Sequence, residues 1–283
     1  MKTLSCILGL LLFSSAVGQD LESIKKAVQS SVVIQFEGEQ GLSMASGTVF
    51  NKVIEGKEHS FILSCSHSIP SIEKRFVAVY YRAPLVMRFN LTPIMYSKAS
   101  GGTDLIVYHC PAKLPSLVKM SDSRSEVGEK IFHVGTPYAL THFASVFDGI
   151  VSKHNARIQP APDPNSVSLY DTGTILSKGG CSGGGVYNEK GEYIGMLLIN
   201  LDASSWSGYR HIIAIKQALK ENNMSWLHND EQVKINDILK IKLTDEGVGL
   251  KPILPTPEKK SKKNARLQRS SIQKGPSARY QAR

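Results

Sequence analysis

The serine with the clearest chemical setting is Ser182, within the stretch Lys-Gly-Gly-Cys-Ser-Gly-Gly-Gly-Val from Lys178 to Val186. Glycines on both sides permit a tight turn ahead of an expected strand, and they let the backbone approach a substrate carbonyl closely. Such a turn can direct the amides of Gly180 and Ser182 at one point, which is how an oxyanion is stabilised. Glycine-rich surface turns that contain a serine are just as common, so this motif indicates a nucleophile only together with a base and an acid.

A base and an acid stand earlier in the chain, at His67 and Asp104. His67 follows an apolar run that ends in small residues, where an imidazole can be exposed. Asp104 opens another apolar run, one residue after the pair Gly101-Gly102, so its carboxylate is placed to orient an imidazole. A serine hydroxyl attacks only when an imidazole accepts its proton and a carboxylate fixes the tautomer. Each residue alone is more typical of a structural role, but the order His67, Asp104, Ser182 predicts a catalytic triad.

The elements that must position these residues are short β-rich runs in two groups, separated by glycine and polar turns. Two groups of about six strands predict an all-β chain with two β-barrels, at about residues 28–118 and 125–215, rather than an alternating α/β sheet. Helical periodicity is confined to residues 20–29 and 215–227. We expect strands at 31–36, 47–53, 60–64, 76–81, 85–89 and 105–109, then at 130–135, 144–152, 167–172, 184–187, 193–199 and 211–215.

The two ends of the chain differ from its body. Residues 1–18 have the basic, apolar and small-residue order of a signal peptide, which predicts a mature chain from Gln19 that is secreted or periplasmic and has no membrane span. One folded domain over residues 19–228, which contains both barrels and the C-terminal helix, is followed by a short extension, 229–251. Residues 252–283 are poor in apolar side chains and predict a disordered tail.

The net charge of +10 is concentrated in that tail. Residues 259–283 contain nine Lys or Arg and no acid, whereas residues 20–258 contain 24 residues of each sign. A fold that binds nucleic acid across its own surface is therefore not supported. The tail itself could attach the chain to an anionic surface or polymer.

Several motifs together resemble the chymotrypsin-like serine proteases, most closely the Deg-type (high-temperature-requirement) branch. The resemblance covers about residues 28–220 and implies a double β-barrel with His67 and Asp104 in the first barrel, Ser182 in the second, and peptide hydrolysis without a cofactor. The PDZ domain that commonly follows the Deg-type protease body is missing. The matching segments, in the family's order, are Ser31-Val-Val-Ile, Ala45-Ser-Gly-Thr-Val-Phe, Ser64-Cys-Ser-His, Thr103-Asp-Leu-Ile-Val, Val134-Gly-Thr-Pro, Phe147-Asp-Gly-Ile-Val-Ser and Gly180-Cys-Ser-Gly-Gly-Gly-Val.

The residue before the proposed nucleophile departs from the family pattern. Cys181 stands where the wider family has Asp and the Deg-type branch usually has Asn. Cys181 is also a rival nucleophile, because related viral proteases use cysteine on the same scaffold. The register favours Ser182, since two glycines then follow the nucleophile.

The remaining cysteines allow two further interpretations. Cys65 and Cys110 are the one plausible disulfide, although a secreted domain of this size does not need one. The same two residues with His67 and His109 could form a metal site, but their spacing is unlike common zinc motifs and would consume the proposed base. We therefore expect no metal.

Substrate preference follows from the resemblance. In the family, the pocket for the residue before the cut is walled by segments that correspond here to 174–178 and 197–200, which include Leu176 and Leu198. Leu176 stands where an acid would attract Arg or Lys. An uncharged, aliphatic side chain is therefore the expected specificity.

The sequence as a whole predicts a serine endopeptidase that acts on protein or peptide substrates. The alternative from a different class is a catalytically inactive protease fold that serves as a binding module, with the basic tail as its attachment to anionic surfaces. No oligomeric state is predicted.

Overall fold

The computed structural model describes residues 21–38, 41–68, 76–82, 85–98, 102–138, 142–158, 168–201, 206–241 and 243. The expected signal peptide and the basic tail lie outside these residues. Residue 242 and residues 244–251 of the extension also lie outside them. The chain divides into residues 1–251 and 252–283, and every feature below belongs to the first unit.

The first six strands form one closed antiparallel barrel, in the order β1-β2-β3-β6-β5-β4. Pairing of β1 with β4, Val33 opposite Val79, closes the ring. All six residues of β6 are buried, which fits a strand covered on both faces. The strands are β1 (Ser31–Gly38), β2 (Gly41–Ile54), β3 (Lys57–Cys65), β4 (Phe76–Arg82), β5 (Leu85–Ser97) and β6 (Leu105–Cys110).

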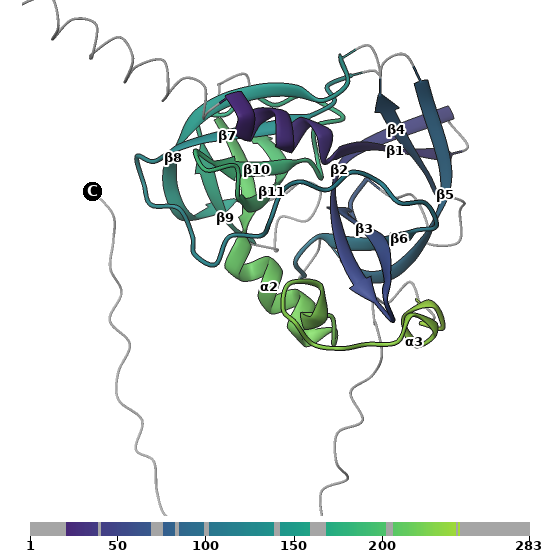
Figure 1. Cartoon of the computed structure of the whole chain (residues 1–283). Helices are drawn as coiled ribbons and strands as arrows, with labels where there is room; N and C mark the ends of the chain where they lie inside the picture. Colours follow the sequence, from purple (N-terminus) through teal and green to yellow (C-terminus); the bar gives the residue numbers. More distant parts are fainter. Residues whose placement is uncertain are drawn as a thin grey trace, which may run out of the picture. The chain divides into compact units, whose positions relative to one another are not determined.

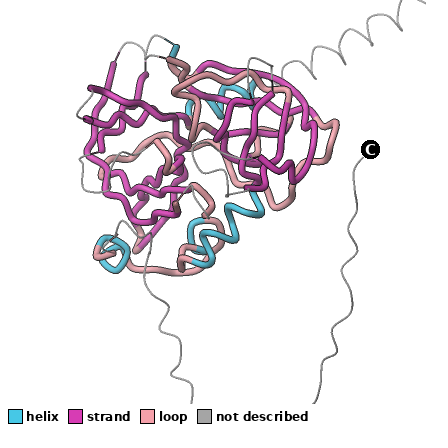
Figure 2. The backbone as a smooth tube through the Cα atoms, turned by 180° about the vertical axis from the view of Figure 1, so that it is seen from behind, coloured by secondary structure: helices cyan, strands magenta, loops and turns pink. Residues whose placement is uncertain are grey.

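The next six strands form a second closed barrel, in the order β10-β11-β12-β9-β8-β7 (Figures 1 and 2). Pairing of β10 with β7 closes this ring. The prediction of an all-β chain with two barrels is confirmed. The strands are β7 (Lys130–Gly135), β8 (Ser145–Ile158), β9 (Ser168–Gly173), β10 (Gly185–Asn188), β11 (Tyr193–Leu201) and β12 (Trp206–His211).

The two barrels pack together through a hydrophobic cluster to which both contribute, and the second barrel holds a further cluster of its own. Phe50 of β2 meets Tyr193 of β11 edge to face, with ring centroids 5.1 Å apart. The hydroxyls of Thr48 and Tyr187 lie 3.3 Å apart between β2 and β10. The middle of β2 therefore lies against β10 and β11 of the second barrel.

The expected strand at 211–215 is wrong, because a helix replaces it. Strand β12 ends at His211, and helix α2 (Ile212–Glu221) begins directly after it. His211 caps this helix: its backbone is extended, and its ring Nδ1 accepts a hydrogen bond from Ala214 N at 3.2 Å. Ile212, Ile215 and Leu219 form the buried stripe of this helix. The predicted C-terminal helix is thus present but begins three residues earlier, and a separate turn of 3₁₀-helix, η2 (Ser225–Leu227), ends that segment.

Two other short helices flank the barrels. Residues 21–29 are helical, as predicted. Helix α3 (Ile235–Leu239) lies in the extension and buries Ile238, and the sequence patterns did not predict it. No helix within the described ranges is long and apolar enough to cross a membrane.

Cys65 and Cys110, whose pairing the sequence left open, do not form a disulfide. Cys65 pairs with Leu105 and Cys110 pairs with Ser60, so five positions of the β3–β6 ladder separate the two cysteines. At about 3.4 Å per residue this is roughly 17 Å, beyond the roughly 7 Å that a disulfide can bridge. Both thiols are free and buried. The same separation prevents the four-residue metal set from converging.

Candidate active site

Asp104 and His67 meet at the end of the first barrel. Strand β3 ends at Cys65 opposite Leu105 of β6, so the residues just beyond these strand ends are neighbours. Asp104, with a positive φ of 59°, turns its carboxylate back toward the β3 end. Its Oδ2 lies 2.7 Å from His67 Nδ1, and its Oδ1 accepts from His67 N at 2.8 Å and Ser66 N at 3.0 Å. The carboxylate is therefore fixed on both oxygens.

This pairing determines the state of the imidazole. A carboxylate accepts, so Nδ1 carries the proton in the neutral ring and Nε2 is left as the basic nitrogen. Burial of the ring opposes its charged form, but the Cys65 sulfur and the Asp104 carboxylate favour the imidazolium by more, and the pKa of His67 is raised above 6.5. The His67 side chain is 35% exposed against 4% for Asp104, so the base is reachable while its partner is shielded.

The loop that carries Ser182, the nucleophile loop (residues 178–184), rests on the first barrel. Ser46 N donates to Ser182 O at 2.8 Å, and Ser46 Oγ donates to Gly180 O at 2.7 Å. Gly183 leaves no room for a side chain, because a Cβ there would lie 2.3 Å from Ser64 Oγ and 2.9 Å from Cys65 N. The loop is thus held against the same end of β3 that leads into His67.

The first turn of the nucleophile loop leaves two amides free. Cys181 N donates to Lys178 O at 3.0 Å, and Gly180 has a φ of 95°, the mark of a type II turn that glycine permits. The Gly179 carbonyl accepts from Tyr138 N at 2.7 Å, so the Gly180 N–H of the same trans peptide points the opposite way. Within the described part of the chain, the amides of Gly180 and Ser182 have no acceptor.

The hydroxyl of Ser182 is not directed at the imidazole. Ser182 Oγ donates to the Leu198 carbonyl at 3.2 Å. The hydroxyl must therefore turn away from the Leu198 carbonyl before His67 can accept this proton, a motion of the picosecond to nanosecond range. Catalytic hydrogen bonds are often absent or long before substrate binds, so the geometry is compatible with a triad.

The two segments expected to wall the substrate pocket are adjacent. Asn200 Nδ2 donates to Ser177 O at 3.1 Å, which joins segment 197–200 to segment 174–178. Leu176 is exposed, whereas Leu198 is buried in the core and meets the site through its carbonyl. The specificity given to Leu176 and Leu198 stays a prediction.

Some groups of the site escaped the sequence patterns. Ser46, Ser66 and Tyr138 hold the nucleophile loop or Asp104 through hydrogen bonds that span up to 134 residues. Small polar residues in the motifs around Ser46 and Ser66 are the only sequence signal, and they do not identify a partner. Tyr138 acts through its backbone amide, which carries no sequence signal.

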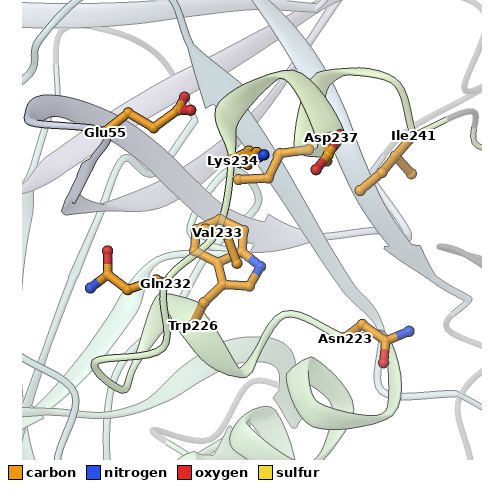
Figure 3. A pocket seen from close by; sticks show the side chains of 9 residues that line it. Glu55, Asn223, Trp226, Gln232, Val233, Lys234, Asp237 and Ile241 are labelled. Carbon is orange, nitrogen blue, oxygen red and sulfur yellow. The ribbon is translucent and has the colours of Figure 1, made fainter.

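A pocket in another part of the molecule is lined by none of the residues of the candidate active site. It has a volume of about 590 Å³ and lies between η2, helix α3 and the turn that follows β2, with Trp226, Val233, Asp237 and Glu55 among its lining (Figure 3). Strand β3 begins next to this turn at Lys57 and ends at Cys65 next to His67. The pocket is therefore at the opposite end of the first barrel from the candidate active site.

Comparison with known proteins agrees with this fold. The sequence pattern of the trypsin-like peptidase domain family matches residues 45–196, which is more than half of the chain. The chain therefore belongs to the trypsin-like peptidase family, as the sequence motifs indicated. None of the curated proteins compared with the chain matches it.

Three solved structures share this fold. A serine endoprotease of Yersinia pestis is 17% identical with a TM-score of 0.57, over 73% of this chain and 66% of that one. Deg5 is 19% identical with a TM-score of 0.54, over 71% and 91%. The HtrA-type protease AlgW, solved with a tripeptide, is 14% identical with a TM-score of 0.56, over 72% and 63%. At these identities the likeness shows a shared fold.

Proposed function

We propose that the chain is a serine endopeptidase in which Ser182 is the nucleophile and His67 is the general base. His67 Nε2 accepts the Ser182 proton, Asp104 orients the ring, and the amides of Gly180 and Ser182 stabilise the oxyanion. The serine oxygen bonds to the scissile carbonyl carbon, and the imidazolium then returns the proton to the departing amine. Water hydrolyses the acyl-enzyme by the same proton transfers, and no cofactor is needed.

One arrangement carries this proposal. The buried Asp104 carboxylate lies on Nδ1 of the partly exposed His67 ring, and this pair lies beside the nucleophile loop, whose Gly180 and Ser182 amides are free. A purely structural Asp–His pair would not require unpaired amides next to a half-buried serine. Free amides beside a nucleophile are the arrangement that stabilises a tetrahedral intermediate.

The test is digestion of an unfolded protein by the purified chain, with the products mapped by mass spectrometry. We expect cuts after uncharged aliphatic residues, since the exposed Leu176 offers no charge at the proposed pocket, where Leu198 contributes only its carbonyl. A fluorophosphonate-treated sample is the control and should not cut. Failure of the untreated chain to cut would favour the alternative of an inactive binding module.

Activity should rise with pH through the titration of His67, because only the neutral ring accepts the serine proton. Since the pKa of His67 is raised, the rising limb of kcat/KM should have its midpoint above pH 6.5. A pH profile of kcat/KM measures this midpoint. A limb at or below pH 6.5 would contradict the geometry around Asp104.

Cys181→Ala should keep measurable peptidase activity. The Cys181 side chain is fully buried in the second barrel, and burial raises the pKa of its thiol, which disfavours the reactive thiolate. Iodoacetamide should accordingly leave the wild-type rate unchanged. Loss of activity in the variant, together with iodoacetamide inhibition of the wild type, would transfer the nucleophilic role to Cys181.

Truncation after Glu258 should leave turnover of a small peptide unchanged. We propose that the nine cations of the removed segment attach the secreted or periplasmic chain to an anionic surface. Vesicles with anionic lipids, in low and high salt, measure this property, and loss of low-salt binding on truncation is expected. Loss of turnover on truncation would instead place the tail in the catalytic fold.

A further inference from the structure

A second histidine, His133, lies beneath the nucleophile loop and takes no part in the proposed proton transfers. It belongs to β7 and is fully buried. Its Nδ1 lies 2.9 Å from the carbonyl oxygen of Gly185, the residue that follows the loop. A carbonyl only accepts, so Nδ1 carries the proton. Its Nε2 is buried and has no partner within the described residues.

The ring fits this place because two glycines beside it lack side chains. A Cβ on Gly135 would lie 2.5 Å from His133 Nε2, and a Cβ on Gly184 would lie 2.6 Å from its Cε1. The first of these positions is also 3.2 Å from the Cα of Cys181. Phe147 stacks on the ring, with centroids 6.0 Å apart and planes inclined by 15°. The imidazole is thus held between Phe147 and the backbone of the nucleophile loop.

The residue before Ser182 provides no polar side chain for this purpose. Cys181 is buried among the apolar residues of the second barrel, where the resembling family carries Asp or Asn. The loop closes on itself through the backbone, from Gly184 N to Cys181 O at 3.0 Å. The side-chain hydrogen bond that fixes the end of the loop comes from His133.

We propose that His133 is a positioning residue for Ser182, which holds the Gly185 carbonyl and supports residues 181–184 from below in place of the side chain at 181. This inference rests on the proposed function. Burial lowers the pKa of His133 to about 4, so the ring is neutral around pH 7. A ring protonated on both nitrogens would place a donor without an acceptor against the loop, which the neutral ring avoids.

Two substitutions separate the hydrogen bond from the packing. The side-chain amide of His133→Asn can occupy the place of Nδ1 and donate to Gly185 O, whereas His133→Leu fills the space without a donor. We expect the leucine variant to lose about 10- to 100-fold in kcat with KM unchanged, the effect of a small displacement of a reacting group. The asparagine variant should recover most of that loss. His142→Leu, which replaces an exposed histidine, is the control and should have no effect.

The fluorophosphonate labelling rate of Ser182 should fall in parallel with kcat. Equal kcat and labelling rates in the leucine and asparagine variants, with an active wild type, would overturn the role of His133 and leave the proposed function intact. An unreactive wild type would overturn the proposed function instead. Amide hydrogen exchange at Gly183 and Gly184 then decides the role of His133, because faster exchange in the leucine variant supports it and unchanged exchange refutes it.

A third variant covers the case in which His133→Leu does not fold. Gly135→Ala adds a methyl group that would lie 2.5 Å from Nε2 and 3.2 Å from the Cα of Cys181, so it mainly displaces the ring, and it leaves the chemistry of the ring unchanged. The same fall in kcat at constant KM is expected. A Gly135→Ala chain with wild-type kcat would overturn the proposal.

Discussion

Replacement of Ser182 by alanine is expected to reduce peptide hydrolysis by up to about a million-fold, since nucleophile and base act as one unit. The fold should persist, because the removed hydroxyl makes one hydrogen bond, to the Leu198 carbonyl, which contributes about 1 kcal/mol. Steady-state kinetics on a small peptide measure the first effect, and thermal unfolding measures the second.

The matched control for Ser182→Ala is Ser123→Ala, which removes an exposed hydroxyl that is distant from Ser182 in the sequence. This control should keep the wild-type rate. A Ser182→Ala chain that hydrolyses peptide within tenfold of the wild type would show that another group attacks the carbonyl.

Asp104→Asn is expected to lower kcat by about ten-thousand-fold. The asparagine oxygen can still accept from the amides of Ser66 and His67, so the local backbone should hold. Its NH₂ group then faces His67 Nδ1 and requires an unprotonated Nδ1, which moves the ring proton to Nε2. A ring protonated on Nε2 cannot accept the proton of Ser182.

Two readouts make the Asp104→Asn result specific. Asp148→Asn changes an exposed carboxylate on β8 and should leave kcat unchanged. The binding of a substrate-like inhibitor to Asp104→Asn should also change little, because the pocket walls are elsewhere. A loss of less than tenfold in kcat would mean that Asp104 does not set the tautomer of His67.

The barrels and the Asp104–His67 pair were predictable because each leaves a local pattern. Alternating and apolar runs marked eleven of the twelve strands near their observed positions, and the residues at the ends of β3 and β6 followed from their places beside apolar runs. The failure at 211–215 has a physical cause. The apolar residues 212, 213 and 215 fit the period of a strand as well as that of a helix. The helix is selected by its cap, a hydrogen bond to the His211 ring, and the apolar pattern does not contain that contact.

The supporting groups of the site were not predictable for a different reason. Ser46, Tyr138 and His133 act on the nucleophile loop from distant parts of the chain, and their contacts exist only once the barrels are closed and packed. The free state of Cys65 and Cys110 likewise depends on the β3–β6 register, which pairwise spacing does not contain. The signal peptide and the basic tail stay predictions, because they lie outside the described residues.

The most direct test of the central claim is capture of the acyl-enzyme. The chain is mixed with an ester substrate, quenched in acid within the first turnover, digested, and searched by mass spectrometry for an acylated residue. The proposed mechanism predicts acylation of Ser182 in the wild type and its loss in His67→Ala, because the base is needed to form the intermediate. Acylation of Cys181, or equal acylation of Ser182 with and without His67, would contradict it.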